Sequence, residues 1–433
     1  MKNKFYTFVA ILATSFAGIF SATAQKSGPV IDTVLMGSGY NNEVYYSMSA
    51  GNRGAVNRKQ WDIAFRASRM SASILTNDAC NNNGIGLSGV ELYAYPKADT
   101  SGWASVDTTG ILAWKKLVNS TTDWETGAFC QNQKGHPDYG WGKYNTASHD
   151  VVGDSLFIIR LRDGSYRKLW IMRKYSSENK TEIRYANLDG SGDTRASVDC
   201  NAQADKNFVG YSITTNAEVA FEPVPSAQWD ILFAKYMYTY PDGTLYPVTG
   251  VLSNYGVKVN KFEHVAPDYR MFDLQAMDST RSPIGWEWKS LDASFIYHVQ
   301  DSLAFFVQDK VGNIHKLVFT DFGGSTTGRI VLNKEMISAA GIDETGKSNL
   351  NAAIYPNPVN GTMNLVINPG TSKTAVVTMH DMSGRTVSAN EYNLPVEVLS
   401  TLRIPVSDVP SGIYIVRIQL GANVISRKVI VNN

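Results

Sequence analysis

The sequence has few cysteines, almost no excess charge and no long apolar run in its interior. Its 433 residues include three cysteines, and 40 basic residues stand against 39 acidic ones. A chain so close to neutral lacks the basic surface that nucleic acids attract, so no nucleic-acid partner is predicted. The apolar run 8–20 has 13 residues, whereas a bilayer-spanning helix needs about 20. No comparable run follows, and no transmembrane segment is predicted.

Common catalytic motifs are also missing. The sequence contains no Gly-x-Ser-x-Gly, His-Glu-x-x-His or Cys-x-x-Cys. The run 84–89 has dinucleotide-fingerprint spacing but precedes an alternating strand, so a turn is predicted. Asp62 and Asp230 could form a carboxylate pair for glycoside cleavage, although a strand or turn role is simpler. We predict no enzymatic activity; the alternative is a secreted hydrolase acting on glycans or peptides.

The N-terminus has the pattern of an export signal. Lys2 and Lys4 precede the apolar run, and the small-residue triplet 22–24 follows it. This pattern predicts a signal peptide at 1–24. No cysteine stands at the cleavage point, which excludes lipoprotein acylation there. Since exported proteins fold under oxidising conditions, we predict a disulfide between Cys80 and Cys130, with Cys200 left free.

The composition favours strands and turns. The chain has 22 Tyr, 17 Phe, 9 Trp and 35 Gly, and aromatic residues are enriched in strands while glycine supplies turns. The length indicates several domains. The predicted class is all-β, with two tandem related β-sandwich-like domains followed by a small Ig-like β-sandwich.

The middle of the chain repeats itself. Trp61-Asp-Ile-Ala-Phe65 recurs as Trp229-Asp-Ile-Leu-Phe233. Four further anchors recur in the same order: Gly89-Val90 with Gly256-Val257, Gly140-Trp141 with Gly285-Trp286, Asp154-Ser-Leu156 with Asp301-Ser-Leu303, and Gly164, Lys168 and Leu169 with Gly312, Lys316 and Leu317. We predict a duplication, with copies at 25–205 and 206–340 packed rigidly together and the anchors superposing in pairs.

Within each repeated pentapeptide, period-2 alternation predicts Trp, Ile and Phe on one face of a half-buried strand. The first copy has a longer loop than the second, with Trp103, Trp114 and Trp124, and we expect binding residues there. Haem capture requires axial ligands in an apolar slot. The best candidates are His136 and His149, which flank an aromatic stretch that includes Tyr139 and Trp141.

The last module, 354–433, follows a polar linker, 341–353. Its ordered motifs are Tyr-Pro-Asn-Pro, Met-Ser-Gly-Arg, Pro-Ser-Gly-Ile-Tyr and a terminal Lys-Val-Ile-Val. This set resembles the type A C-terminal sorting domain of the Bacteroidetes type IX secretion system. The resemblance implies passage across the outer membrane, with the secretion machinery as partner and release or attachment to surface lipopolysaccharide afterwards. The implied sorting residues are Tyr355, Pro356, Asn357, Pro358, Ser383, Gly384, Arg385, Gly412, Tyr414 and Lys428.

The Trp-Asp-Ile-x-Phe strand and the later hairpin resemble the HmuY-like haem-binding family of Bacteroidetes. The second copy matches it better, through Gly250-Val-Leu252, Asn254, Gly256-Val257 and 309–319. The chain departs from that family in lacking the lipoprotein cysteine and in doubling the motif. We therefore predict a secreted or cell-surface binding protein with haem or another small nutrient as ligand; the alternative binding function is that of a surface adhesin.

Overall fold

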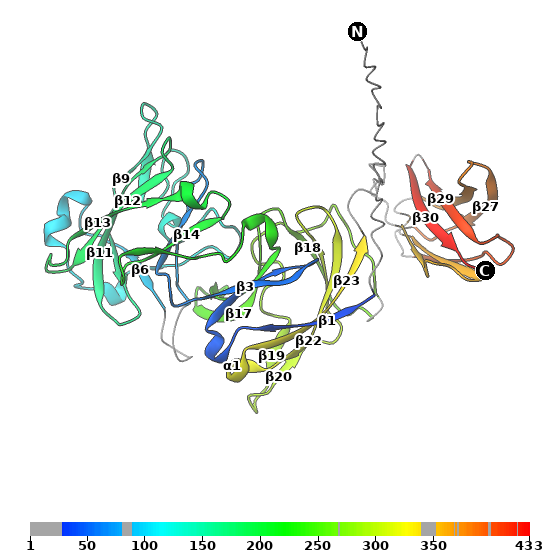
Figure 1. The fold of residues 1–433 in the computed structure, drawn as a ribbon, viewed down its shortest axis with the longest axis horizontal. Helices are drawn as coiled ribbons and strands as arrows, with labels where there is room; N and C mark the ends of the chain where they lie inside the picture. The colour runs from blue at the N-terminus through cyan, green and yellow to red at the C-terminus, as the bar shows by residue number, and fades with distance from the viewer. Residues whose placement is uncertain are drawn as a thin grey trace, which may run out of the picture.

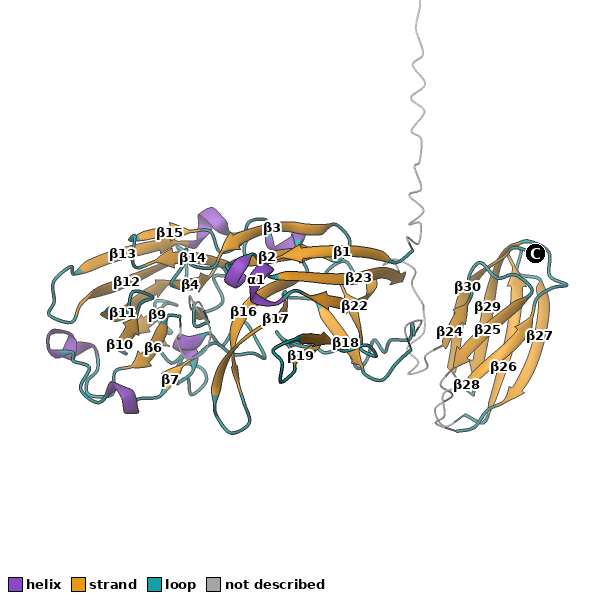
Figure 2. Cartoon of the chain, turned by 90° about the horizontal axis from the view of Figure 1, so that it is seen from below, coloured by secondary structure: helices purple, strands orange, loops and turns teal. Residues whose placement is uncertain are grey.

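The computed structural model describes residues 28–79, 89–266, 269–338, 352–367, 369, 372–396, 400–421 and 423–433. The predicted signal peptide lies outside these residues. The described chain consists mainly of strands and loops, which confirms the all-β class (Figure 2). Its helices are short: α1 (Gly324–Thr327) and the 3-10 helices η1 (Ser38–Tyr40), η2 (Thr100–Ser105), η3 (Ile111–Ala113), η4 (Ala128–Cys130), η5 (Cys200–Gln203) and η6 (Ser226–Gln228). None of the described helices has the length and apolar character needed to cross a membrane.

Two sheets form the first half of the repeat region. The first inner sheet has the order β15-β14-β4-β5, with β4 (Ile63–Arg66), β5 (Ile74–Thr76), β14 (Phe208–Ser212) and β15 (Ala217–Val219). The first outer sheet has the order β13-β12-β11-β10-β6-β7, and β8 and β9 extend it beside β11. Its strands are β6 (Glu91–Ala94), β7 (Lys116–Leu117), β8 (Gly142–Tyr144), β9 (Val151–Gly153), β10 (Phe157–Arg160), β11 (Tyr166–Tyr175), β12 (Lys180–Asn187) and β13 (Thr194–Asp199).

The other half repeats this plan. The second inner sheet has the order β17-β16-β2-β3, with β2 (Asn42–Ser47), β3 (Gly51–Asn57), β16 (Ile231–Thr239) and β17 (Leu245–Ser253). The second outer sheet has the order β1-β23-β22-β21-β18, with β1 (Val30–Leu35), β18 (Lys258–Phe262), β21 (Ala304–Gln308), β22 (Ile314–Phe322) and β23 (Arg329–Ser338). A separate hairpin joins β19 (Lys289–Leu291) and β20 (Tyr297–Val299).

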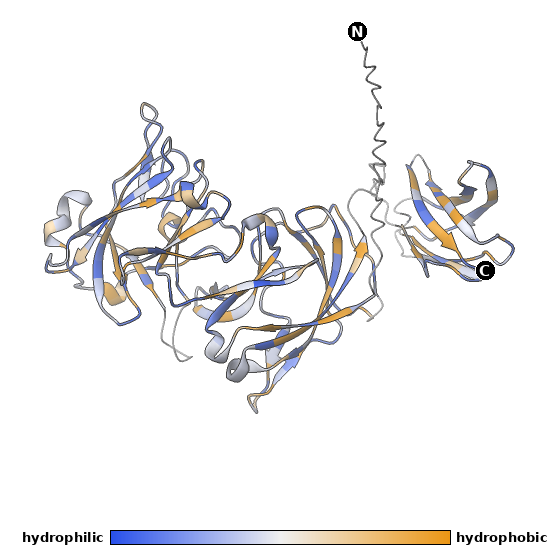
Figure 3. Cartoon of the chain, viewed as in Figure 1, coloured by the Kyte–Doolittle hydropathy of each residue, from blue (hydrophilic) through white to orange (hydrophobic). Residues whose placement is uncertain are grey.

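Three apolar layers join the four sheets. The first core, between the first outer and inner sheets, contains Phe65 and Phe157. The second core contains Phe233 and Phe305 between the second inner and outer sheets. A third cluster, the shared core, takes residues from both inner sheets. Each inner sheet is therefore apolar on both faces, and the two halves pack as one body of four sheets. Hydrophobic residues recur along the strands of both halves (Figure 3).

The two repeated tryptophans lie in the shared core, together with Ala64 and Leu232. Ile63 and Phe65 point the opposite way, into the first core. The prediction that Trp, Ile and Phe share one face is therefore wrong. Trp61 lies ahead of β4, which begins at Ile63, so strand alternation does not fix the direction of its side chain.

The strand pairing groups the chain differently from the predicted division at 205/206. In the second inner sheet β2 pairs with β16, where Tyr46 lies opposite Ile231. In the first inner sheet β14 pairs with β4, where Tyr211 lies opposite Ile63. β1 likewise pairs with β23. The strands before the first Trp thus complete the second half, and the blue N-terminal strands lie beside the yellow β22 and β23 in Figure 1.

The aspartates of the repeated pentapeptide fix these exchanged strands. The Asp62 Oδ2 atom accepts a hydrogen bond from the Ile213 amide at 2.8 Å, just beyond β14. The Asp230 Oδ2 atom accepts one from the Met48 amide at 2.7 Å, just beyond β2. Burial raises the pKa of both carboxyls. These contacts give both aspartates the structural role that the sequence favoured.

The strand register of the β10–β11 and β21–β22 hairpins corrects one of the predicted pairs of anchor residues. Phe157 lies opposite Leu169, and Phe305 lies opposite Leu317. Leu156 therefore corresponds to Ala304 and not to Leu303. The repeated Asp-Ser-Leu is offset by one residue, and a shift of one residue moves a strand side chain to the other face. The pairing of Lys168 with Lys316 is retained, since both residues follow the turn glycine by four positions.

Buried carboxyls in the shared core predict that stability depends on pH. The Glu43 Oε2 atom accepts a hydrogen bond from the Trp61 indole at 3.3 Å, and burial raises the pKa of Glu43 to about 7. A raised pKa means that the fold favours neutral Glu43. The contribution of Glu43 to the free energy of unfolding is full below the pKa that this group has in the unfolded chain, and it is lost as the pH rises through about 7.

Glu43→Gln keeps the shape of this side chain and removes its charge. The free energy of unfolding of the wild type should fall between pH 5 and pH 8 as Glu43 ionises. We expect the fall to be smaller for Glu43→Gln, and the difference between the two proteins to be about 3 kcal/mol at most. Urea denaturation at both pH values measures the difference. Glu178→Gln, at an exposed position, is the matched control. Equal pH dependence in wild type and Glu43→Gln would contradict the assignment.

Candidate functional site

The C-terminal module is a sandwich with its own core. One sheet has the order β24-β25-β28, with β24 (Ala352–Tyr355), β25 (Thr362–Ile367) and β28 (Ser400–Pro405). The other has the order β27-β26-β29-β30, with β26 (Thr374–Asp381), β27 (Thr386–Asn393), β29 (Gly412–Leu420) and β30 (Asn423–Val431). Alternating residues of β29, including Tyr414, Val416 and Ile418, face the core between them.

The predicted sorting residues divide into structural and exposed groups. Asn357 ties the Tyr-Pro-Asn-Pro segment to β30: its Oδ1 atom accepts from the Ile430 amide at 2.9 Å, and its Nδ2 atom donates to the Lys428 carbonyl at 3.1 Å. The buried Tyr414 donates to the Pro410 carbonyl at 2.8 Å. Tyr355 and the Lys428 side chain remain exposed. Pro356, Pro358 and the turn residues 383–385 are exposed as well, so a transport partner can contact most of the motif residues directly.

The Met-Ser-Gly-Arg motif forms the β26–β27 turn. Asp381, the residue before it, accepts hydrogen bonds from the Ser383 hydroxyl at 2.6 Å and from the Arg385 guanidinium at 3.0 Å. These bonds lower the pKa of Asp381 to about 2. Gly384 has a φ of 86°, which glycine adopts without strain. The motif therefore specifies a tight, charged turn.

Comparison with known families matches residues 353–432 to the secretion system C-terminal sorting domain. These residues are a secretion sorting domain. The match confirms the predicted type IX sorting module, and it marks the chain for delivery to the cell surface or the medium. The HmuY-like resemblance of the repeat region stays a prediction.

No curated protein matches the chain. Among solved structures, dimeric latent PorU from Porphyromonas gingivalis is similar at 11% identity with a TM-score of 0.20, over 79% of this chain and 34% of that one. The chain thus spans about a third of the length of PorU. A similarity this weak supports no conclusion about the repeat region.

The predicted haem ligands lie near one another at an exposed loop end. The rings of His136 and His149 have their centroids 5.3 and 6.1 Å from that of Tyr144, and the His149 Nδ1 atom lies 2.7 Å from the Tyr144 hydroxyl. Tyr139 is partly buried against the first core. Trp141 is fully buried there and donates to the Ala72 carbonyl at 2.9 Å. The structure therefore gathers the two histidines around Tyr144 and assigns Trp141 to the core.

Both described cysteines are buried, free thiols. Burial raises the pKa of Cys130 to about 12 and that of Cys200 to about 11, which suppresses their reactivity. A free Cys130 does not support the predicted disulfide, and its predicted partner, Cys80, lies outside the described residues. Cys200 is free, as predicted.

The longer loop of the first copy serves packing. Trp124 enters the shared core and donates to the Ser253 carbonyl of the second half at 2.8 Å. Trp103 and Trp114 pack against the solvent-side face of the first outer sheet, over Tyr95 and Ile158. We expected binding residues in this loop. Its three tryptophans instead cover apolar surface.

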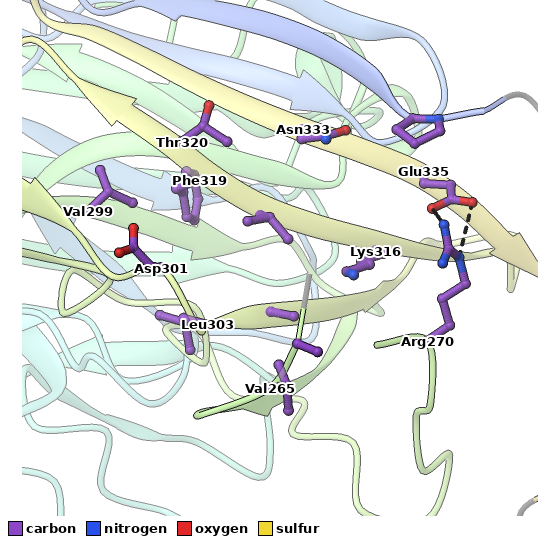
Figure 4. A pocket seen from close by; sticks show the side chains of 14 residues that line it. Val265, Arg270, Val299, Asp301, Leu303, Lys316, Phe319, Thr320, Asn333 and Glu335 are labelled. Atoms are coloured by element: carbon purple, nitrogen blue, oxygen red, sulfur yellow. Dashed lines mark hydrogen bonds and ion pairs between the residues drawn. The ribbon is translucent and has the colours of Figure 1, made fainter. Parts of the chain in front are cut away.

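The corresponding face of the second outer sheet is hollowed. A cavity of about 330 Å³, the outer pocket, lies over β21, β22 and β23. Its floor contains Ala304, Lys316, Val318, Thr320, Asn333 and Glu335, and the segment after β18 borders it through Val265, Ala266 and Arg270 (Figure 4). Ligand pockets begin at about 300 Å³, so the outer pocket can hold a small molecule.

Polar and apolar groups alternate in the outer pocket. Arg270 forms an ion pair with Glu335 at 2.8 Å at its edge. Lys316 is only 5% exposed, and Val318 and Ala304 lie on the same sheet face. Sequence reasoning missed this site because its residues come from three strands and a loop without forming a motif. The one signal in the sequence was the Lys-Leu pair that recurs at 168–169 and 316–317, since Lys316 lines the pocket.

The sorting assignment predicts a secretion defect on truncation. Because the module has its own core, removing the residues after Asn351 should leave a folded repeat region without its export address. Expression in a type IX-secreting host should trap this truncated chain in the periplasm, in a protease-resistant form, while the full chain reaches the surface or the medium. Normal export of the truncated chain, measured by cell fractionation, would overturn the assignment.

Proposed function

We propose that the chain is a secreted or cell-surface binding protein, exported by the type IX system, whose repeat region holds a small ligand in the outer pocket. One observation carries the proposal. Two related outer sheets present equivalent faces, and the second face leaves a cavity of about 330 Å³ where the first is covered by tryptophans. A cavity retained beside a filled counterpart is the best candidate for a binding site on the described chain.

The pocket chemistry favours binding over catalysis. Among its described lining residues, the titratable ones are Arg270, Asp301, Lys316 and Glu335, and there is no histidine, cysteine or serine. Among the described residues, no group of three or more His, Cys, Asp or Glu could hold a metal ion. Arg270 and Glu335 are paired with each other at the pocket edge. Attachment to surface lipopolysaccharide after sorting stays a prediction for the C-terminal module.

Val318→Trp tests the outer pocket. The larger side chain projects from the pocket floor and should exclude ligands, as Trp170 occupies the equivalent position of the first copy. Ligand-observed NMR on the full chain, with monosaccharides, dicarboxylates and amino-acid derivatives as probes, should give at least one signal that Val318→Trp abolishes. If every probe signal survives in a folded variant, the outer pocket is not the binding site.

Haem capture remains a separate prediction. One observation favours it, since His136 and His149 both lie beside the Tyr144 ring. An absorbance titration of the full chain with haem should then show a Soret shift that His136→Ala with His149→Ala removes. Met70→Ala, at another exposed position of the first half, is the control. A shift that survives the double substitution would reject these ligands, and no shift would reject haem.

A further inference from the structure

The duplication allows the outer pocket to be compared with its filled counterpart, residue by residue. Lys168 lies opposite Ala186, and Trp170 lies opposite Arg184. In the second outer sheet Lys316 lies opposite Glu335, and Val318 lies opposite Asn333. The pocket floor residues Lys316, Val318 and Asn333 thus correspond to Lys168, Trp170 and Arg184.

The first copy holds one of its own side chains at these positions. The Lys168 Nζ atom lies 5.0 Å from the centroid of the Trp103 ring, and the Arg184 guanidinium carbon lies 4.5 Å from it. Lys168 also donates a hydrogen bond to the Trp103 carbonyl at 2.9 Å. Trp103 comes from the loop after β6, and the segment after β18 bounds the outer pocket. Of the three positions the lysine is the same in both copies, so the outer pocket retains the residue that, in the first copy, lies over an indole and donates to its adjacent carbonyl.

We propose that the outer pocket binds a tryptophan residue, supplied as the free amino acid or within a peptide, in the way that the first copy binds Trp103. This inference rests on the proposed function and names its ligand class. The indole would lie over Lys316 and Asn333, and the neighbouring carbonyl oxygen would accept from Lys316. Val318 in place of Trp170 provides the additional space.

The chemistry of the pocket fits such a ligand. A lysine beneath an aromatic ring gains a cation–π attraction of about 0.5–2 kcal/mol, depending on its burial, and Lys316 is nearly buried. Leu303 and Val265 line the cavity with apolar surface for the ring. Glu335 and Asp301 line it as well and can accept hydrogen bonds from an indole or an amine.

Calorimetry on the full chain tests the proposal with N-acetyl-tryptophanamide as the probe and N-acetyl-alaninamide as the apolar control. We expect one site for the indole probe and no detectable binding of the control. Val318→Trp and Lys316→Met should each weaken binding at least tenfold, whereas Lys134→Met, at an exposed position of the first half, should not change it. Free tryptophan and a Gly-Trp-Gly peptide, compared in parallel, distinguish the two sources.

Trp103→Ala combined with Trp170→Val provides a reciprocal test that does not depend on losing a function. Trp170 stands where the outer pocket has Val318, so the two substitutions together give the first copy an open site like the outer pocket, and the number of bound probe molecules should rise from one to two. Circular dichroism confirms that each variant is folded. A folded chain with both substitutions that still binds one probe molecule would overturn the proposed correspondence.

The possible failures are distinguishable. If no indole probe binds but another small molecule binds and Val318→Trp blocks it, the tryptophan inference is wrong and the proposed binding function stands. If nothing binds in a way that Val318→Trp blocks, both are wrong. Indole binding that persists in Val318→Trp would place the site elsewhere and reject this inference.

Discussion

The shared core is the contact on which the rest of the repeat region depends. Trp61 and Trp229 both lie in it, and each indole donates to a buried carboxyl group, that of Glu43 and that of Glu222 respectively. Because both faces of each inner sheet are apolar, neither half could expose its inner sheet to water without a large hydrophobic cost. The two copies therefore form one folding unit, and the exchanged strands connect them through the backbone as well.

The exchange also explains why the repeated pentapeptide is the best-preserved part of the duplication. Its Trp fills the shared core, its Ile and Phe fill the core of their own half, and its Asp binds the backbone beyond a strand from the other part of the chain. Asn77 and Asn254 each donate to the carbonyl of the repeated Trp, at 2.8 and 2.7 Å. A short motif with this many long-range contacts tolerates little change.

The solvent-side faces of the outer sheets carry fewer such constraints, and there the copies have diverged. The first copy covers its face with Trp103 and Trp114, while the second covers part of its face with Tyr269, Phe272 and Met277 and leaves the outer pocket. Where duplicated halves share a scaffold, packing explains the residues that they have in common. The places where the halves differ are therefore good candidates for function. In the sorting module the motif residues build turns and strand contacts, and most of them are nevertheless exposed at the surface.

The sequence by itself determined the strand content, the duplication and the sorting module, because each is written in local patterns: aromatic composition, an ordered set of anchors and a contiguous motif set. Only the tertiary structure decided which copy each strand joins, since β2 and β14 carry the same local pattern and either could in principle pair with β4 or β16. It also decided the direction of Trp61, which lies before its strand, and the one-residue offset between Leu156 and Leu303. The outer pocket could not be read from the sequence, because a cavity depends on which side chains meet over a sheet and how much space they leave, and local pattern records neither.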